Sequence, residues 1–88
     1  MIYVTEYFSP TCVPCKLLKL RLQAMQTAKP DCISVKFVDA TTDSEAKELG
    51  IQSCPHLVVK DEQGKELLNQ HADLSIVQKL EKLMTEGA

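Results

Sequence analysis

Two of the four cysteines in this 88-residue chain belong to a CVPC motif at positions 12–15. The motif follows a run rich in β-branched and aromatic residues at 2–8 and opens a stretch with helical periodicity at 13–28. At the first turn of a helix, unpaired backbone N–H groups and the positive end of the helix dipole stabilise a thiolate. The spacing therefore predicts thiol–disulfide exchange, in which Cys12 attacks a disulfide and Cys15 resolves the mixed disulfide.

Cysteine pairs of this kind also bind metals, or pack as inert side chains in a core. A structural zinc site needs four ligands, and Cys54 and His56 could join Cys12 and Cys15 to supply them. A metal-binding or cluster-carrying module that uses these four residues is therefore the alternative to redox chemistry. We favour the redox function, with no cofactor and no bound metal, and expect Cys32 to be structural or an incidental surface thiol.

The composition argues against several other functions. The net charge of −2 and the pI of about 5.6 are too weak an imbalance for binding to nucleic acid or to an anionic membrane, which needs clustered Lys and Arg. No apolar run approaches the roughly 20 residues of a membrane span, and the start MIYVTEYF lacks the features of a signal peptide. We therefore expect a cytoplasmic monomer, with residues 1–88 forming a single domain.

Hydrophobic patterning predicts secondary structure in the order β-α-β-α-β-β-α. The expected strands are at 2–8, 33–38, 56–60 and 65–69, and the longest helix is at 13–28. The first strand–helix–strand unit predicts a parallel, right-handed crossover, and the last two strands predict an antiparallel hairpin. The expected fold is therefore α/β: a four-stranded mixed sheet flanked by three helices, with helices on both faces.

Local signals mark the ends of the two shorter helices. The pattern T-x-x-E from Thr42 to Glu45 has the form of a capping box that opens a short helix, and Gly50 suits its C-terminal end. Asp73 is a candidate N-cap for the last helix. The apolar face of that helix is expected to carry Ile76, Val77, Leu80, Leu83 and Met84.

Over nearly its whole length the chain resembles the thioredoxin superfamily. FSPTCVPCK at 8–16 resembles the active-site loop, and VKFVDATTDSEAKELGIQSCPHLVV at 35–59 resembles the strand–helix–strand that ends in the family's cis-proline. The resemblance implies that Pro55 is that cis-proline, which would place the backbone of Cys54 beside the Cys12 sulfur, exposed for pairing with a substrate peptide. The length is closer to glutaredoxins and small glutaredoxin-like thioredoxins, since a further N-terminal strand and helix are missing.

The resemblance also implies a general protein-disulfide reductase. Its partners would be an NADPH-dependent flavoprotein reductase of the thioredoxin type and disulfide-containing target proteins, with ribonucleotide reductase as one candidate target. Thr11, Val13 and Pro14 would form the substrate-binding rim with Cys54 and Pro55. Thr11 and Val13 stand where thioredoxins usually carry Trp and Gly, so the apolar rim is altered.

A glutathione-coupled glutaredoxin is the second candidate of the same class. Glutaredoxins usually carry Tyr or Phe where Pro14 stands, and a Thr-Val-Pro segment where this chain has Ser53-Cys54-Pro55. The Gly-Gly pair of glutaredoxins is replaced by the sequence at 69–72. These differences disfavour glutathione binding.

Glu6 is the only charged residue in positions 1–15. It shares strand parity with Ile2, Val4 and Phe8, and so is expected to point with apolar neighbours. It stands six residues before Cys12, where thioredoxins carry a buried Asp. We hypothesise that Glu6 is a desolvated carboxyl with a raised pKa that relays a proton to or from Cys15. The alternative is a solvated side chain at the end of the sheet.

Four further side chains, at Lys36, Cys54, His56 and His71, are also considered for a place in the site. By the same resemblance, Lys36 is expected near Glu6. Cys54 is hypothesised to compete for Cys12 through a disulfide or a shared metal, or else to fill its position as a small buried residue. His56 is expected to be a spacer on its strand, and His71 carries no functional signal.

Overall fold

The computed structural model describes residues 1–48, 50 and 54–86, apart from the side chains of residues 45 and 86. The expected order of elements is confirmed. The elements are β1 (Ile2–Phe8), α1 (Val13–Ala28), β2 (Ile33–Asp39), α2 (Ser44–Glu48), β3 (His56–Lys60), β4 (Glu66–His71) and α3 (Ile76–Glu86).

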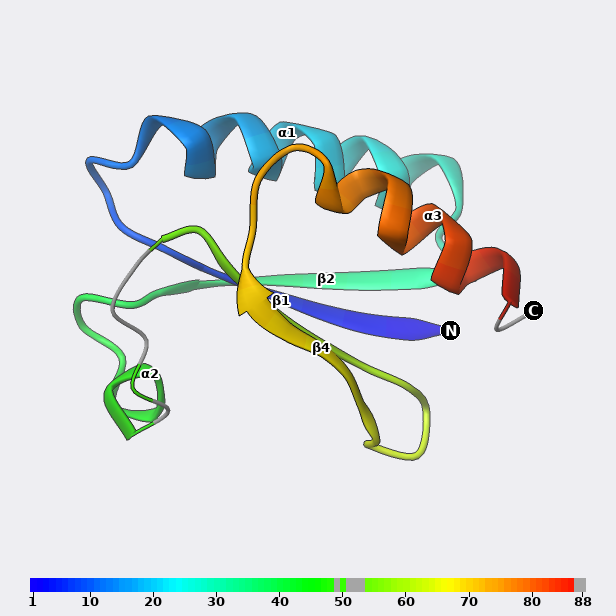
Figure 1. Ribbon diagram of the computed structural model, residues 1–88. Coiled ribbons are helices and arrows are strands. Elements are labelled where there is room, and N and C mark those ends of the chain that lie inside the picture. The colour runs from blue at the N-terminus through cyan, green and yellow to red at the C-terminus, as the bar shows by residue number, and fades with distance from the viewer. Residues whose placement is uncertain (49, 51–53, 87–88) are drawn as a thin grey trace.

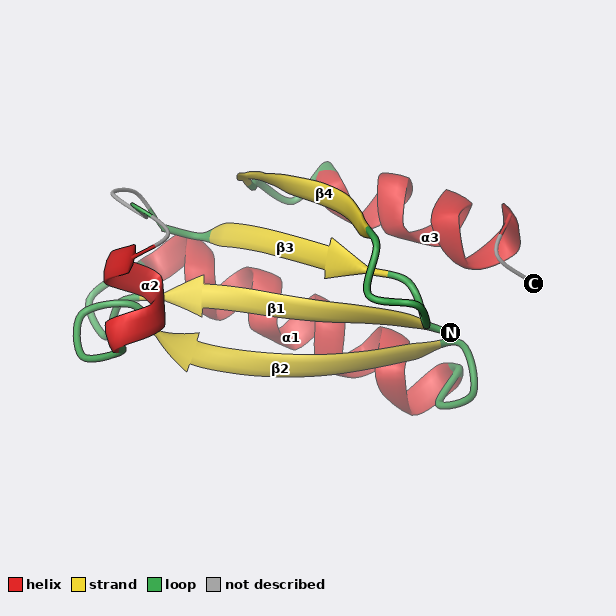
Figure 2. Ribbon diagram, turned by 90° about the horizontal axis from the view of Figure 1, so that it is seen from below, coloured by secondary structure: helices red, strands yellow, loops and turns green. Residues whose placement is uncertain are grey.

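The four strands form one mixed sheet in the order β2-β1-β3-β4 (Figure 2). β1 pairs with β2 in parallel and with β3 antiparallel, and β3 pairs with β4 antiparallel. The main shift from the sequence-based boundaries is in β4, which was expected at 65–69. Lys65 stays in the turn because its N–H donates to Asp61 Oδ1 at 2.9 Å. The strand instead runs on to His71, which pairs with His56.

Helices lie on both faces of the sheet, but they cover the faces unequally. α1 and α3 lie side by side on one face, while α2 stands at one end of the other (Figure 1). The first face holds the main core, which joins β1 and β3 to both long helices through Val4, Val59, Leu18, Leu22, Ile76 and Leu80. On the second face, Ala46 of α2 is buried with Tyr7 and Val58.

The residue that caps α2 differs from the expected one. Asp43, not Thr42, accepts a hydrogen bond from the backbone N–H of Ala46, at 2.9 Å from Oδ2. Thr42 is occupied elsewhere, because its backbone N–H and its hydroxyl both donate to the carbonyl oxygen of Asp39. The prediction of Thr42 as the cap is therefore wrong by one residue. The expected partner of Thr42 in a capping box, the side chain of residue 45, lies outside the described part.

The other two end signals agree with the structure. Gly50 has φ +72°, a left-handed conformation that suits glycine after a helix, and its N–H donates to the carbonyl of Lys47. Asp73 Oδ1 accepts from the N–H of Ser75 at 2.9 Å, so Asp73 caps the turn that leads into α3. None of the helices in the described part of the chain is both long and apolar enough to span a membrane.

A buried and an exposed leucine of α1 offer a matched pair of substitutions for measuring how much the core contributes to stability. Leu22 is fully buried, whereas Leu20, two residues earlier, is 64% exposed. Replacing Leu22 with alanine leaves a cavity, and should lower the free energy of unfolding by about 3 kcal/mol. Leu20→Ala should change it by less than about 0.5 kcal/mol. Urea unfolding of the oxidised protein measures both values, and equal losses would contradict the assigned packing face of α1.

Candidate active site

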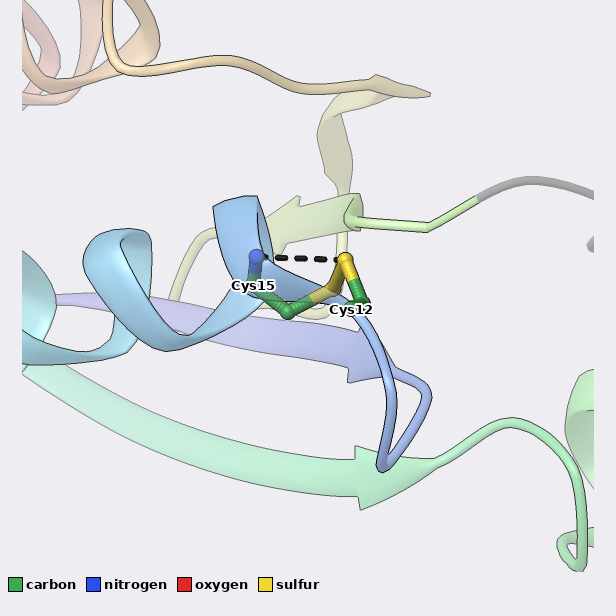
Figure 3. The surroundings of a disulfide bond; sticks show 2 residues. All are labelled: Cys12 and Cys15. Atoms are coloured by element: carbon green, nitrogen blue, oxygen red, sulfur yellow. Dashed lines mark hydrogen bonds between the residues drawn. A yellow bond between two sulfur atoms is a disulfide. The ribbon is translucent and has the colours of Figure 1, made fainter.

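The two cysteines of the CVPC motif are joined by a disulfide at the N-terminus of α1 (Figure 3). Cys12 is the N-cap residue: its backbone is extended, at φ −85° and ψ 108°, and its Sγ accepts from the backbone N–H of Cys15 at 3.2 Å. Pro14 lies in the first helical turn, where a missing N–H costs nothing. The helix start thus places a backbone donor against the Cys12 sulfur, where it would stabilise negative charge.

The two sulfur-bearing residues differ in exposure. Cys12 is half-buried, whereas Cys15, in the first turn of α1, is only 2% exposed. Thr11, Val13 and Pro14, which surround Cys12 in the chain, are all exposed. A macromolecular partner can therefore reach Cys12 from outside, while Cys15 is reached through Cys12 or from within the fold.

The peptide bond between Cys54 and Pro55 is cis, which confirms the expectation from sequence. Pro55 is buried at the start of β3. Because β3 runs antiparallel to β1 and His56 pairs with Tyr7, Pro55 lies at the end of the sheet from which the loop to Cys12 departs. The same end of the sheet therefore carries the cis-proline and the disulfide.

Glu6 is buried among apolar side chains, with an exposed fraction of 0%. Neither of its carboxylate oxygens has a hydrogen-bond partner among the described residues. Burial raises the pKa of Glu6 from 4.5 to about 7, and the nearby ammonium of Lys19 opposes this rise. The desolvated carboxyl expected from sequence is confirmed, and the alternative of a solvated side chain is wrong.

The expectation that Lys36 lies near Glu6 is wrong. In the β1–β2 register Lys36 pairs with Thr5, whereas Glu6 pairs with Phe37. Successive residues of a strand point to opposite faces, so Lys36 is turned away from Glu6. The cation comes instead from α1, where the Lys19 Nζ lies 5.2 Å from the centre of the Phe37 ring.

A cavity of about 250 Å³ connects the buried acid with the buried cysteine. Glu6, Cys15 and Lys19 all line it. The volume exceeds the ~30 Å³ share of one water molecule, so the cavity has room for water to carry a proton between the two groups. The remaining lining residues are Phe8, Ser9, Pro10 and Lys16.

Sequence reasoning did not single out Lys19, Ser9 or Pro10 as part of this site. A signal for Lys19 was present, because it follows Cys15 by four residues and so lies one helical turn away. No comparable signal marks Ser9 and Pro10. Their place depends on how the loop after β1 closes, through the hydrogen bond from the Cys12 N–H to the Ser9 carbonyl.

Cys54 is a free, half-buried thiol. Burial raises its pKa, and the nearby carboxylates of Asp39 and Glu6 raise it further, so the group favours the protonated form. The hypothesis that it competes for Cys12 stays a prediction. Ser53, its neighbour in the glutaredoxin comparison, lies outside the described residues.

The alternative metal site is not assembled in this structure. Within residues 1–48, 50 and 54–86, no three His, Cys, Asp or Glu side chains lie together as metal ligands. The imidazole of His56, one of the four proposed ligands, is hydrogen-bonded through Nε2 to Asn69 Oδ1 at 2.6 Å. Cys32 is also free, and it packs against the main core as a partly buried side chain.

The sequence model of the thioredoxin family matches residues 1–85. The chain belongs to the thioredoxin family. With its bridged cysteine pair it is a thiol–disulfide oxidoreductase, and the thioredoxin family generally acts on disulfide-containing targets and is itself re-reduced by a reductase. No curated protein matches the sequence significantly.

Solved thioredoxin structures share the fold. The germline-specific thioredoxin Deadhead of Drosophila melanogaster superposes with a TM-score of 0.76 at 16% identity, covering 97% of this chain and 79% of that one. Fasciola hepatica thioredoxin gives 0.76 at 22% identity, with the same coverage of 97% and 79%. Malassezia sympodialis thioredoxin gives 0.72 at 25%, covering 97% and 73%. The thioredoxin-like architecture is therefore confirmed.

Proposed function

We propose that this thioredoxin-family protein reduces disulfides in target proteins through Cys12 and Cys15, and is re-reduced by an NADPH-dependent flavoprotein reductase of the thioredoxin type. The observation that carries the proposal is the bridged pair at the start of α1, with Cys12 accessible and Cys15 buried. This asymmetry suits a nucleophile that meets the target and a resolving group that acts from within.

In the reduced protein, the Cys12 thiolate attacks one sulfur of the target disulfide. The target S–S bond breaks, one target sulfur leaves as a thiolate, and the other is joined to Cys12. Cys15 then loses its proton and attacks the Cys12 sulfur, which releases the second target thiolate and forms the intrachain disulfide. Two electrons have passed to the target, and the reductase returns two electrons from NADPH.

Glu6 is proposed to accept the proton that Cys15 loses during resolution. A pKa of about 7 allows the carboxyl to exchange protons near neutral pH. The cavity that both side chains line supports a short path between them. Resolution in the Glu6→Gln variant should therefore lose its dependence on a group that titrates near pH 7.

The residues around Cys12 are proposed to bind the target backbone and its flanking side chains. Thr11, Val13 and Pro14 are exposed beside the sulfur and form a rim. Cys54 and Pro55 precede β3 at the same end of the sheet, where an extended target segment could pair with the backbone of Cys54. A cytosolic location belongs to the proposal, because unpaired thiols such as Cys32 persist in reducing compartments.

A reductase-coupled assay tests the proposed function. The oxidised protein, mixed with insulin, NADPH and a thioredoxin reductase, should drive NADPH oxidation and insulin reduction in proportion to its concentration. Replacing the reductase by glutathione and glutathione reductase should give much slower turnover. Faster turnover with glutathione would assign the protein to the glutaredoxin alternative, and no turnover with either donor would contradict disulfide reduction. Ribonucleotide reductase is a further target to test in the same assay.

A further inference from the structure

Exposed apolar side chains are concentrated on the outer side of α1, next to Cys12. Among the described residues the large exposed hydrophobic side chains are Tyr3, Val13, Leu17, Leu20 and Leu74. Val13, Leu17 and Leu20 follow one another at spacings of four and three, so they form one stripe along the helix. Contiguous exposed apolar surface of this kind marks an interaction site.

A hollow beside the active-site loop extends this stripe toward α3. Leu17 and Leu74 line it together with Pro14, and its volume is about 510 Å³. Asp73 and Ser75 complete the lining, and Asp73 Oδ1 accepts hydrogen bonds from the backbone N–H and the hydroxyl of Ser75. Three of its five lining residues, Pro14, Leu17 and Leu74, are apolar, so the hollow can hold an apolar side chain of a partner.

The stripe is bordered by positive charge. α1 carries Lys16, Lys19 and Arg21 and no acidic residue, although the whole chain has a net charge of −2. At about 100° of rotation per residue, Lys16 and Arg21 fall on opposite sides of the apolar stripe. The surface beside the disulfide thus combines an apolar strip with a cationic border, and it complements a partner with the opposite charge.

We propose that this stripe docks the disulfide-bearing segment of a target protein, which places an apolar side chain in the hollow between Leu17 and Leu74 and carboxylates beside Lys16 and Arg21. The inference depends on the proposed function and adds to it a class of substrate: disulfides flanked by apolar and acidic residues.

Continuity with Cys12 argues for the target as occupant. Any target must bring its sulfur to Cys12, and Val13 adjoins that residue in the chain. At a rise of about 1.5 Å per residue, Leu17 and Leu20 lie only about 8 and 12 Å along the axis from Cys12. One target segment that reaches the sulfur therefore covers the stripe as well.

Three synthetic peptides test the proposal, each closed by one disulfide. The first carries a leucine and two glutamates beside its cysteines, the second has two lysines in place of the glutamates, and the third has serine in place of the leucine. The chain is reduced with dithiothreitol, freed of reductant, and mixed with each peptide. The reaction is monitored by acid quenching and chromatography, because the protein contains no tryptophan whose fluorescence could report on it.

Each rate is divided by the rate of the same chain with the small neutral reagent bis(2-hydroxyethyl) disulfide. The wild-type chain should prefer the first peptide over each of the others by about tenfold, as expected for losing one well-placed interface contact. The preference over the lysine peptide should fall as salt is added, because the charges lie at the surface.

Matched variants assign the preference to the stripe. Leu17→Ser and Leu74→Ser should each lose most of the preference for leucine over serine. Tyr3→Ser is the control, because Tyr3 is as exposed as Leu74, at 45%, but lies on β1 away from the disulfide. It should keep the wild-type preference.

Several results would overturn the inference. Equal normalised rates for the three peptides would remove the substrate class, and an equal loss in Tyr3→Ser would remove the assignment to the stripe. If Leu17→Ser slowed only reduction by thioredoxin reductase, the stripe would dock that enzyme and not the target. A chain that reduced neither the peptides nor the small disulfide would contradict the proposed function itself.

Discussion

Replacing Cys12 with serine should lower the rate of protein-disulfide reduction by at least about a thousandfold, because a serine hydroxyl neither forms a stable anion near neutral pH nor forms a disulfide. No other described sulfur occupies an equivalent place. Cys15 is buried, and Cys54 is held toward its protonated form by burial and by the carboxylates of Asp39 and Glu6. The insulin assay with NADPH and a thioredoxin reductase measures the loss.

Two serine substitutions serve as controls for that experiment. Cys32→Ser changes a thiol packed against the core, and Cys54→Ser changes the residue before the cis-proline. Cys32→Ser should retain the wild-type rate. Cys54→Ser should retain the two-electron reaction, and any change in its redox potential would support the hypothesis that Cys54 competes for Cys12. A Cys12→Ser chain with substantial activity would show that another thiol is the nucleophile.

Replacing Glu6 with glutamine should remove a pH dependence of about 3 kcal/mol from the free energy of unfolding. Between pH 4.5 and pH 8, the difference in stability between the Glu6→Gln variant and the wild type should shift by that amount in favour of the variant. This value follows from the pKa of Glu6, which burial raises from 4.5 to about 7. Between these pH values the folded protein binds more protons than the unfolded chain. The contribution of Glu6 to the stability of the wild type therefore falls as pH rises through this range, and levels off above it.

Glutamine keeps the shape of the side chain without a group that ionises, so the stability of the Glu6→Gln variant lacks this contribution. Urea unfolding from pH 4.5 to 8, with the disulfide kept oxidised, gives the difference between the two proteins. Glu66→Gln, at an exposed glutamate on β4, is the matched control and should show a constant difference from the wild type. A constant difference for Glu6→Gln as well would contradict the buried, desolvated carboxyl.

The sequence predicted the fold and the central chemistry because those features depend on local patterns. The apolar period of 13–28 defines α1 with the bounds that were expected, and Pro14 fits only near its start. The cis bond before Pro55 and the burial of Glu6 also followed from strand patterning and family resemblance. These signals lie within a few residues of the features that they predict.

Features that depend on contacts between elements were predicted less well. The cation near Glu6 was expected on the neighbouring strand, but a shift of one position in register turns Lys36 to the opposite face, and α1 supplies Lys19 instead. Similarly, Asp43 and not Thr42 caps α2, because the hydroxyl of Thr42 donates its hydrogen bond to the carbonyl oxygen of Asp39. Periodicity along one segment holds no information about which neighbour competes for a hydrogen bond.

The exposed apolar stripe on α1 is another feature that depends on contacts between elements. The periodicity of 13–28 predicts an amphipathic helix, but which of its leucines stay uncovered depends on how the helix packs against the rest of the fold. Leu22 is fully buried, while Leu17 is 49% exposed. An amphipathic pattern thus predicts that a helix buries a face, but not how wide the buried face is.

The most direct test is to trap the first covalent intermediate with the Cys15→Ser variant. That chain, reduced and mixed with a disulfide-containing target, lacks the resolving thiol and should accumulate a mixed disulfide, which peptide mapping by mass spectrometry locates. The account predicts that the target is joined to Cys12. A target joined to Cys32 or Cys54, or the absence of any mixed disulfide while the target is still reduced, would contradict it.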